Sequence, residues 1–143
     1  MITYPVTFEA SAQSLSGMDK PWKIKASNFE SSCAVPVEFD GTGGTFSPED
    51  FFMLALQNCF IATFKVFAHY SKLNYSALDV DAKLVVNKDA SGKPWMEAVH
   101  LDISLNGIED ERKAQLLINK TLDNGFILRS VQTKITTEIK INA

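Results

Sequence analysis

The residues of this sequence best suited to chemistry are its two cysteines, Cys33 and Cys59. The first ten residues, MITYPVTFEA, lack the basic and apolar regions of a signal peptide, so we expect no disulfide framework. Two thiols are too few for a structural zinc site, and neither His69 nor His100 lies at ligand spacing from them. We therefore expect no metal and no cofactor, interpret both histidines as structural, and ask whether either thiol is reactive.

Cys59 lies in an apolar segment that we predict to be helical. A free cysteine in such a helix is usually an inert core residue. A reactive cysteine needs a lowered pKa and some exposure. Cys33 lies in a predicted strand, where it could be a buried core residue or a second thiol acting with Cys59. The residues alone leave both alternatives open.

A strong helix start precedes Cys59. Ser47 can cap the helix, Pro48 suits its first turn, and Glu49 and Asp50 suit the positive end of the helix dipole. We predict a helix from Ser47 to about Leu73. Its first half, residues 51–64, is apolar on every side, which is typical of a helix buried all round. One sheet from a chain this small cannot cover both faces, so we expect a second subunit to do so.

Alternating apolar residues predict six strands, and a helical repeat predicts a second helix. The order is βββ-α-ββ-α-β, which indicates an α+β fold in one domain, residues 1–143. The predicted strands are Ile2–Ala10, Trp22–Ser27, Cys33–Phe39, Ala77–Asn87, Met96–Leu105 and Val131–Ile141, and the second helix is Asp110–Asp123.

Composition narrows the class of partner. The 143 residues are 45% hydrophobic and 22% charged, with a formal net charge of -3. This balance offers no basic face for nucleic acid and no basic run for a membrane surface. The longest charge-free apolar stretch is shorter than the ~20 residues that span a bilayer. We expect a soluble cytoplasmic protein without nucleic-acid or membrane partners.

The sequence resembles the OsmC/Ohr family in the glycine pair Gly43-Gly44, the helix start Ser47-Pro48-Glu49-Asp50 and the helix segment Leu54-Ala55-Leu56-Gln57-Asn58-Cys59-Phe60. The order of elements also matches over nearly the whole chain. The resemblance implies an OsmC-like fold, with antiparallel sheets wrapped around two long central helices in an intertwined homodimer. It also implies thiol-dependent reduction of hydroperoxides, including organic ones.

The resemblance assigns roles to few residues. Cys59 matches the cysteine that attacks the peroxide, and Glu49 matches the glutamate of the site. The family's second cysteine is absent, since its aligned position is Gly125, and no arginine precedes Arg112. Arg129 could substitute for the missing arginine or be a solvated loop residue.

Two hypotheses follow. The first is a one-cysteine peroxide reductase whose Cys59 is reduced by an external thiol or resolved by Cys33. The alternative is a non-catalytic dimer of the same fold that binds a small apolar ligand near its phenylalanines. Ten residues of helix rise about 15 Å, so Glu49 and Cys59 of one chain cannot touch in a straight helix. We therefore expect the two to share a pocket at the subunit boundary.

Overall fold

The computed structural model describes all residues, 1–143, and divides them into two compact units. We call Met1–Phe51 the N-terminal unit and Phe52–Ala143 the C-terminal unit. The two units are described separately below. The element order is that of an α+β fold, as the sequence predicts.

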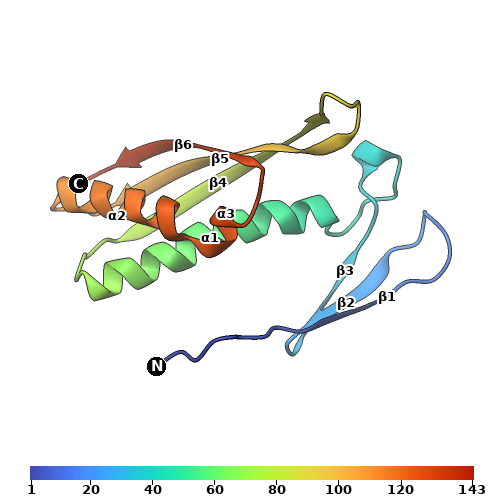
Figure 1. The fold of residues 1–143 in the computed structure, drawn as a ribbon, viewed down its shortest axis with the longest axis horizontal. Helices are drawn as coiled ribbons and strands as arrows, with labels where there is room; N and C mark the ends of the chain where they lie inside the picture. The colour runs from blue at the N-terminus through green and yellow to red at the C-terminus, as the bar shows by residue number, and fades with distance from the viewer. The chain divides into compact units, whose positions relative to one another are not determined.

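The N-terminal unit is built on a small antiparallel sheet of three strands, β1 (Ala10–Gln13), β2 (Trp22–Ala26) and β3 (Phe29–Cys33), coloured blue to cyan in Figure 1. Alternation along β2 places Trp22 and Ile24 on one face and Lys23 and Lys25 on the other. The sheet therefore has one apolar and one polar face.

Two of the predicted strands of this unit are wrong in position. Of the predicted strand Ile2–Ala10, residues 2–9 lie outside any sheet, and pairing begins only at Ala10. Its alternation is strand-like, but a strand also needs a partner, which these residues lack within the chain. The third strand ends at Cys33, and a 3-10 helix (Val37–Phe39) follows Pro36 where we predicted strand. Proline has no N–H to donate to a ladder, so the sheet does not continue through it.

Helix α1 (Pro48–Tyr70) begins as predicted, with reciprocal hydrogen bonds across its first turn. The Ser47 hydroxyl accepts from the Asp50 N–H at 3.0 Å, and the Asp50 carboxylate accepts from the Ser47 N–H at 2.9 Å. This arrangement is a capping box with aspartate in place of glutamate, and it satisfies two N–H groups that the helix leaves free.

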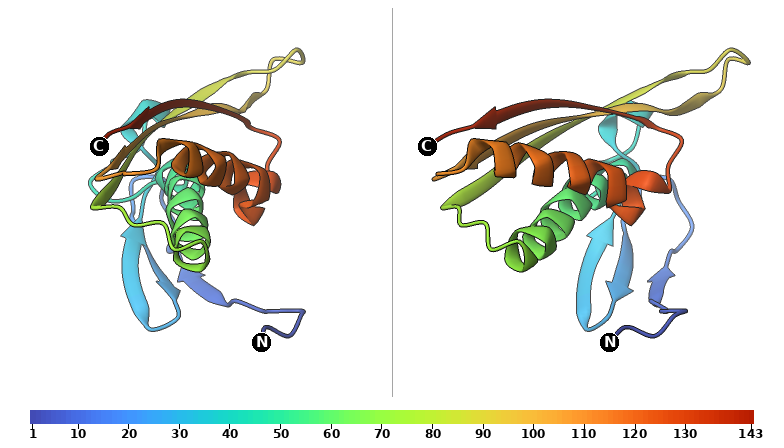
Figure 2. Two further views of the ribbon diagram at one scale, coloured as in Figure 1. Left: turned by 90° about the vertical axis from the view of Figure 1, so that its left-hand side faces the viewer. Right: turned by 60° about the vertical axis from the view of Figure 1, so that its left-hand side comes forward.

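The C-terminal unit packs helices against one face of a second sheet. The sheet has the order β4 (Ala77–Lys88), β5 (Pro94–Asn106), β6 (Lys134–Ile141), with β4 antiparallel and β6 parallel to β5. Figures 1 and 2 show α1 and α2 (Glu111–Asn124) on the same side of this sheet. The core lies between these layers, where inward residues of β5 such as Leu101 and Ile103 meet Phe60 and Phe64 of α1.

Helix α1 is buried on one face only. Its residues fully covered within the chain are Leu56, Cys59, Phe60, Phe64 and Ala68. The opposite side leaves Ala55, Asn58, Ala62 and Val66 exposed. By length and composition α1 could also cross a membrane, although core helices of soluble proteins pass the same test. Only 28% of its most apolar stretch is buried within the chain, so much of its apolar surface has no cover there.

Candidate active site

The thiol of Cys59 lies in the core of the C-terminal unit, on the buried face of α1. The residue is 6% exposed and belongs to the cluster that includes Phe60 and Leu128. Its sulfur lies 3.9 Å from the hydroxyl oxygen of Thr63, which stands one helical turn further along α1. Thr63 was not singled out from the sequence, although its i+4 spacing from Cys59 places it on the same helical face.

Gly125 lies directly against the Cys59 sulfur. A Cβ atom added to Gly125 would stand 3.2 Å from Cys59 Sγ and 2.9 Å from Leu128 Cδ1. Gly125 follows α2 and precedes the one-turn helix α3 (Phe126–Arg129), which the sequence analysis did not predict. Its φ of -60° suits any residue, so close approach to its neighbours, rather than backbone conformation, is what a side chain would disturb here.

The spacing between Gly125 and Cys59 matches that of a disulfide. In a disulfide, the Cβ of one cysteine lies about 3.0 Å from the sulfur of the other, given an S–S bond of about 2.05 Å. The position of Gly125 meets this distance almost without adjustment. A side chain introduced at position 125 would therefore begin within disulfide reach of the Cys59 sulfur.

Glu49 is separated from Cys59 along α1. The two residues stand ten positions apart in one unbroken helix, a rise of about 15 Å. The structure therefore does not bring them together within the chain. Glu49 Oε2 is shielded from solvent and has no hydrogen-bond partner in the chain. A buried carboxylate oxygen without a donor is costly, and this atom is the buried side-chain oxygen of the chain that lacks one.

Cys33 is the thiol that shares the N-terminal unit with Glu49. Cys33 is buried at the end of β3, where it forms a parallel bridge with Phe46, and Ala34 N–H donates to the Phe46 carbonyl at 2.8 Å. Burial raises the pKa of the Cys33 thiol, and the carboxylates of Glu49 and Asp50 raise it further. Cys33 is therefore a neutral thiol at neutral pH.

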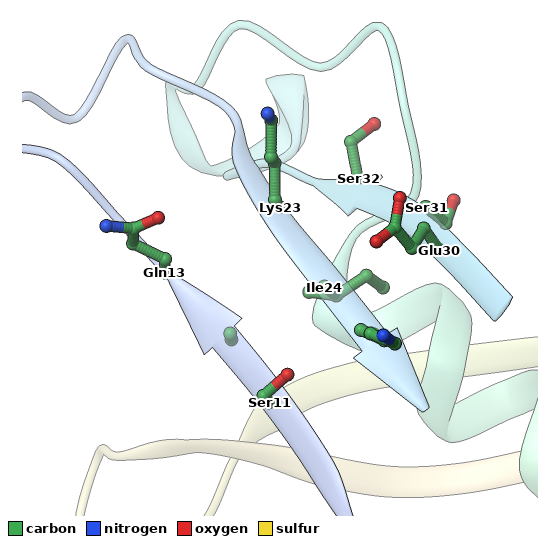
Figure 3. Close-up of a pocket in the computed structure, with 9 residues that line it drawn as sticks. Ser11, Gln13, Lys23, Ile24, Glu30, Ser31 and Ser32 are labelled. Carbon is green, nitrogen blue, oxygen red and sulfur yellow. The ribbon is translucent and has the colours of Figure 1, made fainter. Parts of the chain in front are cut away.

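A hollow of about 670 Å³ lies along the apolar face of the N-terminal sheet. Its mostly apolar lining includes Trp22, Ile24, Phe29, Cys33, Pro48 and Phe51. A second hollow of about 560 Å³ is lined mainly by residues with polar side chains, among them Ser11, Gln13, Lys23, Glu30 and Ser32 (Figure 3). The second hollow is lined by neither of the two cysteines and neither of the two histidines.

The remaining residues considered from the sequence have surroundings of their own. Arg129 ends α3 with an exposed side chain and no recorded ion pair. His69 is exposed near the end of α1 and stacks edge-on against Tyr70. His100 lies on the outward face of β5, where its ring contacts Thr136 and Asp102. None of the three forms a hydrogen bond with Cys59, whose polar contact is with Thr63.

The fold and the helix-borne thiol define the class of protein. The family model for OsmC-like proteins matches residues 41–140, so the chain belongs to the OsmC-like family. Among curated proteins, none matches the chain.

Solved structures of this family share the fold at low sequence identity. An OsmC-like protein of unknown function from Vibrio cholerae gives a TM-score of 0.80 at 19% identity, over 94% of this chain and 99% of that chain. An organic hydroperoxide resistance protein OsmC from Legionella pneumophila gives 0.76 at 16%, over 99% of this chain and 100% of that chain. OhrB, the organic hydroperoxide resistance protein of Bacillus subtilis, gives 0.68 at 16%, over 95% and 98%. These likenesses confirm the predicted fold class.

Proposed function

We propose that this protein reduces hydroperoxides, including organic ones, through Cys59 and an external thiol. The Cys59 thiolate attacks the distal peroxide oxygen and the O–O bond breaks. The leaving alkoxide takes up the proton that the thiol released and becomes an alcohol. Cys59 becomes a sulfenic acid, which a thiol converts to a mixed disulfide with loss of water. A second thiol attacks that disulfide and returns Cys59 to the reduced state.

The observation that carries the proposal is the contact between Cys59 and position 125. The sulfur lies at disulfide distance from a backbone position 66 residues further along the chain. That geometry fits a sulfur that passes through a bonded, oxidised state. Two structural neighbours bear the description of organic hydroperoxide resistance proteins, which supports the same substrate class.

We expect the working form to be a homodimer in the cytoplasm. Most of the apolar stretch of α1 lies uncovered within the chain, and a second copy of α1 would cover it. The Oε2 atom of Glu49 also needs a donor that the chain does not supply. Glu49 would then act in a site completed by the partner, because a rise of about 15 Å separates it from Cys59 of its own chain.

Sedimentation tests the dimer directly. We expect a stable dimer at micromolar concentration, with an apolar interface of about 2,000 Å² or more. Replacing exposed Ala62 of α1 by Glu should produce monomers, whereas replacing exposed Leu116 of α2 by Glu should leave the dimer intact. A stable folded monomer of the native chain would contradict the proposal.

Peroxide treatment followed by mass spectrometry tests the chemistry. Without added thiol, excess cumene hydroperoxide should add two or three oxygens to Cys59, because no second cysteine at position 125 intercepts the sulfenic acid. With dithiothreitol present, turnover should be measurable and should vanish in Cys59→Ser but not in Cys33→Ser. A disulfide between Cys33 and Cys59 would instead assign the resolving role to Cys33. A Cys59 that stays unmodified would remove the peroxidase proposal.

A second function, apolar ligand binding without catalysis, is favoured by the hollow on the N-terminal sheet. Its volume of about 670 Å³ suits a small molecule, and its lining is mainly apolar. In this case Trp22 fluorescence should change on adding a small apolar ligand, and Ile24→Glu should abolish the change. Binding of this kind in a protein whose Cys59 does not react with peroxide would establish the alternative.

A further inference from the structure

Three carboxylates form a row across the outward face of the C-terminal sheet. The register pairs Asp81 of β4 with Asp102 of β5, and Asp102 with Glu138 of β6. Paired side chains on one face lie close together, and like charges placed opposite each other destabilise a sheet. In the N-terminal sheet, by contrast, an acidic residue pairs with a basic one, since Glu30 lies opposite Lys25. The acidic row has no such partner built into its register.

The lysines nearby do not neutralise this row. Lys83 lies two residues beyond Asp81, and Lys140 two residues beyond Glu138, both on the same face. Neither lysine forms an ion pair with a carboxylate. The salt bridge of the chain joins His100 and Asp102. A hollow of about 280 Å³ lies over the row and is lined by its three carboxylates, by Asp79 and by Lys140, so acids outnumber the one base there.

His100 completes a set of metal-binding donors beside the row. One donor atom each from His100, Asp102 and Glu138 lie within 4.8 Å of one another. The Nδ1 atom of His100 is hydrogen-bonded to the Thr136 hydroxyl at 2.7 Å, and Nε2 lies 3.1 Å from Asp102 Oδ1. Thr136 lies outside the donor set and holds the ring so that Nε2 faces the carboxylates. Metal-bound histidines are held in this way, through the nitrogen that does not bind the metal.

We propose that His100, Asp102 and Glu138 form a surface site for a divalent transition-metal ion of the Zn²⁺ class. One imidazole and two carboxylates suit such an ion, and their combined charge offsets its own. Zinc–nitrogen and zinc–oxygen bonds of about 2.0–2.2 Å place tetrahedral donors about 3.4 Å apart, so His100 and Asp102 are already in range and a pair at the 4.8 Å limit would close by about 1 Å. His100 and Asp102 have side chains 38% and 55% exposed, which leaves them free to do so. Water fills the remaining coordination position.

This site lies on the sheet face away from the core that holds Cys59, so it is independent of the proposed peroxide chemistry. Residues that alternate with His100 and Asp102 on β5, Leu101 and Ile103, point into the core. Metal binding is therefore expected to leave Cys59 reactivity unchanged. Its direct effect is on the stability of the sheet, where the ion relieves the repulsion between strands.

Calorimetric titration of the metal-free, full-length protein with Zn²⁺ tests the proposal. We expect saturable binding of one ion per chain that weakens by about tenfold or more in His100→Ala and in Glu138→Gln. Thr136→Val should weaken binding by about tenfold without removing a donor, because the ring loses its support. His69→Ala is the matched histidine control, and Asp123→Asn, at an exposed acid of α2, is the matched acid control, since both residues lie outside the donor set and the hollow. Neither control should change the affinity.

Histidine ring resonances give a second readout that the thiols cannot mimic. Zn²⁺ should shift the ring signals of His100 and leave those of His69 in place. Thermal unfolding of each variant without metal shows that it is folded before titration. The proposal is overturned if His100→Ala binds Zn²⁺ as tightly as the native chain. It is also overturned if Mg²⁺ binds as tightly as Zn²⁺, because that pattern marks a general counterion effect on an acidic surface.

Discussion

The two cysteines of this chain are both buried, yet their surroundings differ in kind. Cys33 ends a strand of the N-terminal unit, beside the acidic first turn of α1, and its pKa is raised by burial and by those acids. Cys59 lies in the core of the C-terminal unit, against a glycine that leaves the sulfur at disulfide distance from the backbone. Burial is therefore common to both thiols, and the neighbouring residues are what distinguish their surroundings.

The substitution expected to have the largest effect on this difference between the two thiols is Gly125→Cys. The introduced cysteine should form a disulfide with Cys59 under mild oxidation, since the required Cβ–sulfur distance is already present. Closing a loop of this length should stabilise the oxidised form by about 4 kcal/mol in the chain-entropy model. Mass spectrometry should show the loss of two hydrogens, and unfolding in denaturant should show the gain in stability.

Gly125→Ser is the control for this change, because it adds a side chain of similar size without a second thiol. It should crowd Leu128 and slightly destabilise the protein without forming a crosslink. A Gly125→Cys protein whose two thiols stay reduced under oxidant would show that position 125 is not a competent place for a resolving thiol.

How much of this site the sequence could predict depends on the range of the contact. The helix start at Ser47 was predicted correctly, because its capping residues act within one turn. The contact between Gly125 and Cys59 spans 66 residues, and no local pattern encodes it. It became visible only through resemblance to a family with a cysteine at that position.

The elements of the fold also divide into those set by local patterns and those set by distant contacts. The alternation in residues 77–87 and 96–105 identified the long hairpin, because its partners are adjacent in sequence. The alternation in residues 2–10 predicted a strand that does not form, because strand formation also requires a pairing partner. The parallel pairing of β6 with β5 could not be deduced from its alternation, since direction is set by the crossover through α2.

A smaller effect is expected from the two helix caps, because the cap of α1 follows Phe46, the bridge partner of Cys33, whereas the cap of α2 is at the end of that helix far from Gly125. Ser47→Ala removes the cap of α1 in the N-terminal unit, and Asp110→Ala removes the cap of α2, where Asp110 accepts from the Lys113 N–H at 2.9 Å. Each should cost about 1 kcal/mol of unfolding free energy. Ser47→Ala should also speed alkylation of Cys33, because the first turn of α1 loosens beside it, while Asp110→Ala should not. Equal acceleration of both thiols by Ser47→Ala would mean that the two surroundings are not independent.

The smallest expected effect is electrostatic and concerns Cys33. Because burial is the largest cause of its raised pKa and Glu49 a lesser one, Glu49→Gln should lower that pKa without returning it to its ordinary value of 9.0. Alkylation of Cys33 in a Cys59→Ser background should then proceed faster at a given pH, since more thiolate is present. Glu38→Gln changes an exposed acid of the same unit that is not among the causes of the shift, and it should leave the rate unchanged.

The same raised pKa fixes the sign of a stability change with pH. A folded-state pKa above 9.0 means that the unfolded chain loses its proton first as pH rises. The contribution of Cys33 to stability is therefore complete below pH 9.0 and is lost as pH rises from there through the folded-state pKa. Cys33→Ala should flatten that part of the curve, and Glu49→Gln should narrow it. If Cys33→Ala leaves the alkaline limb unchanged, the strand cysteine is not the group that titrates there, and the contrast between the two thiols rests on Gly125 alone.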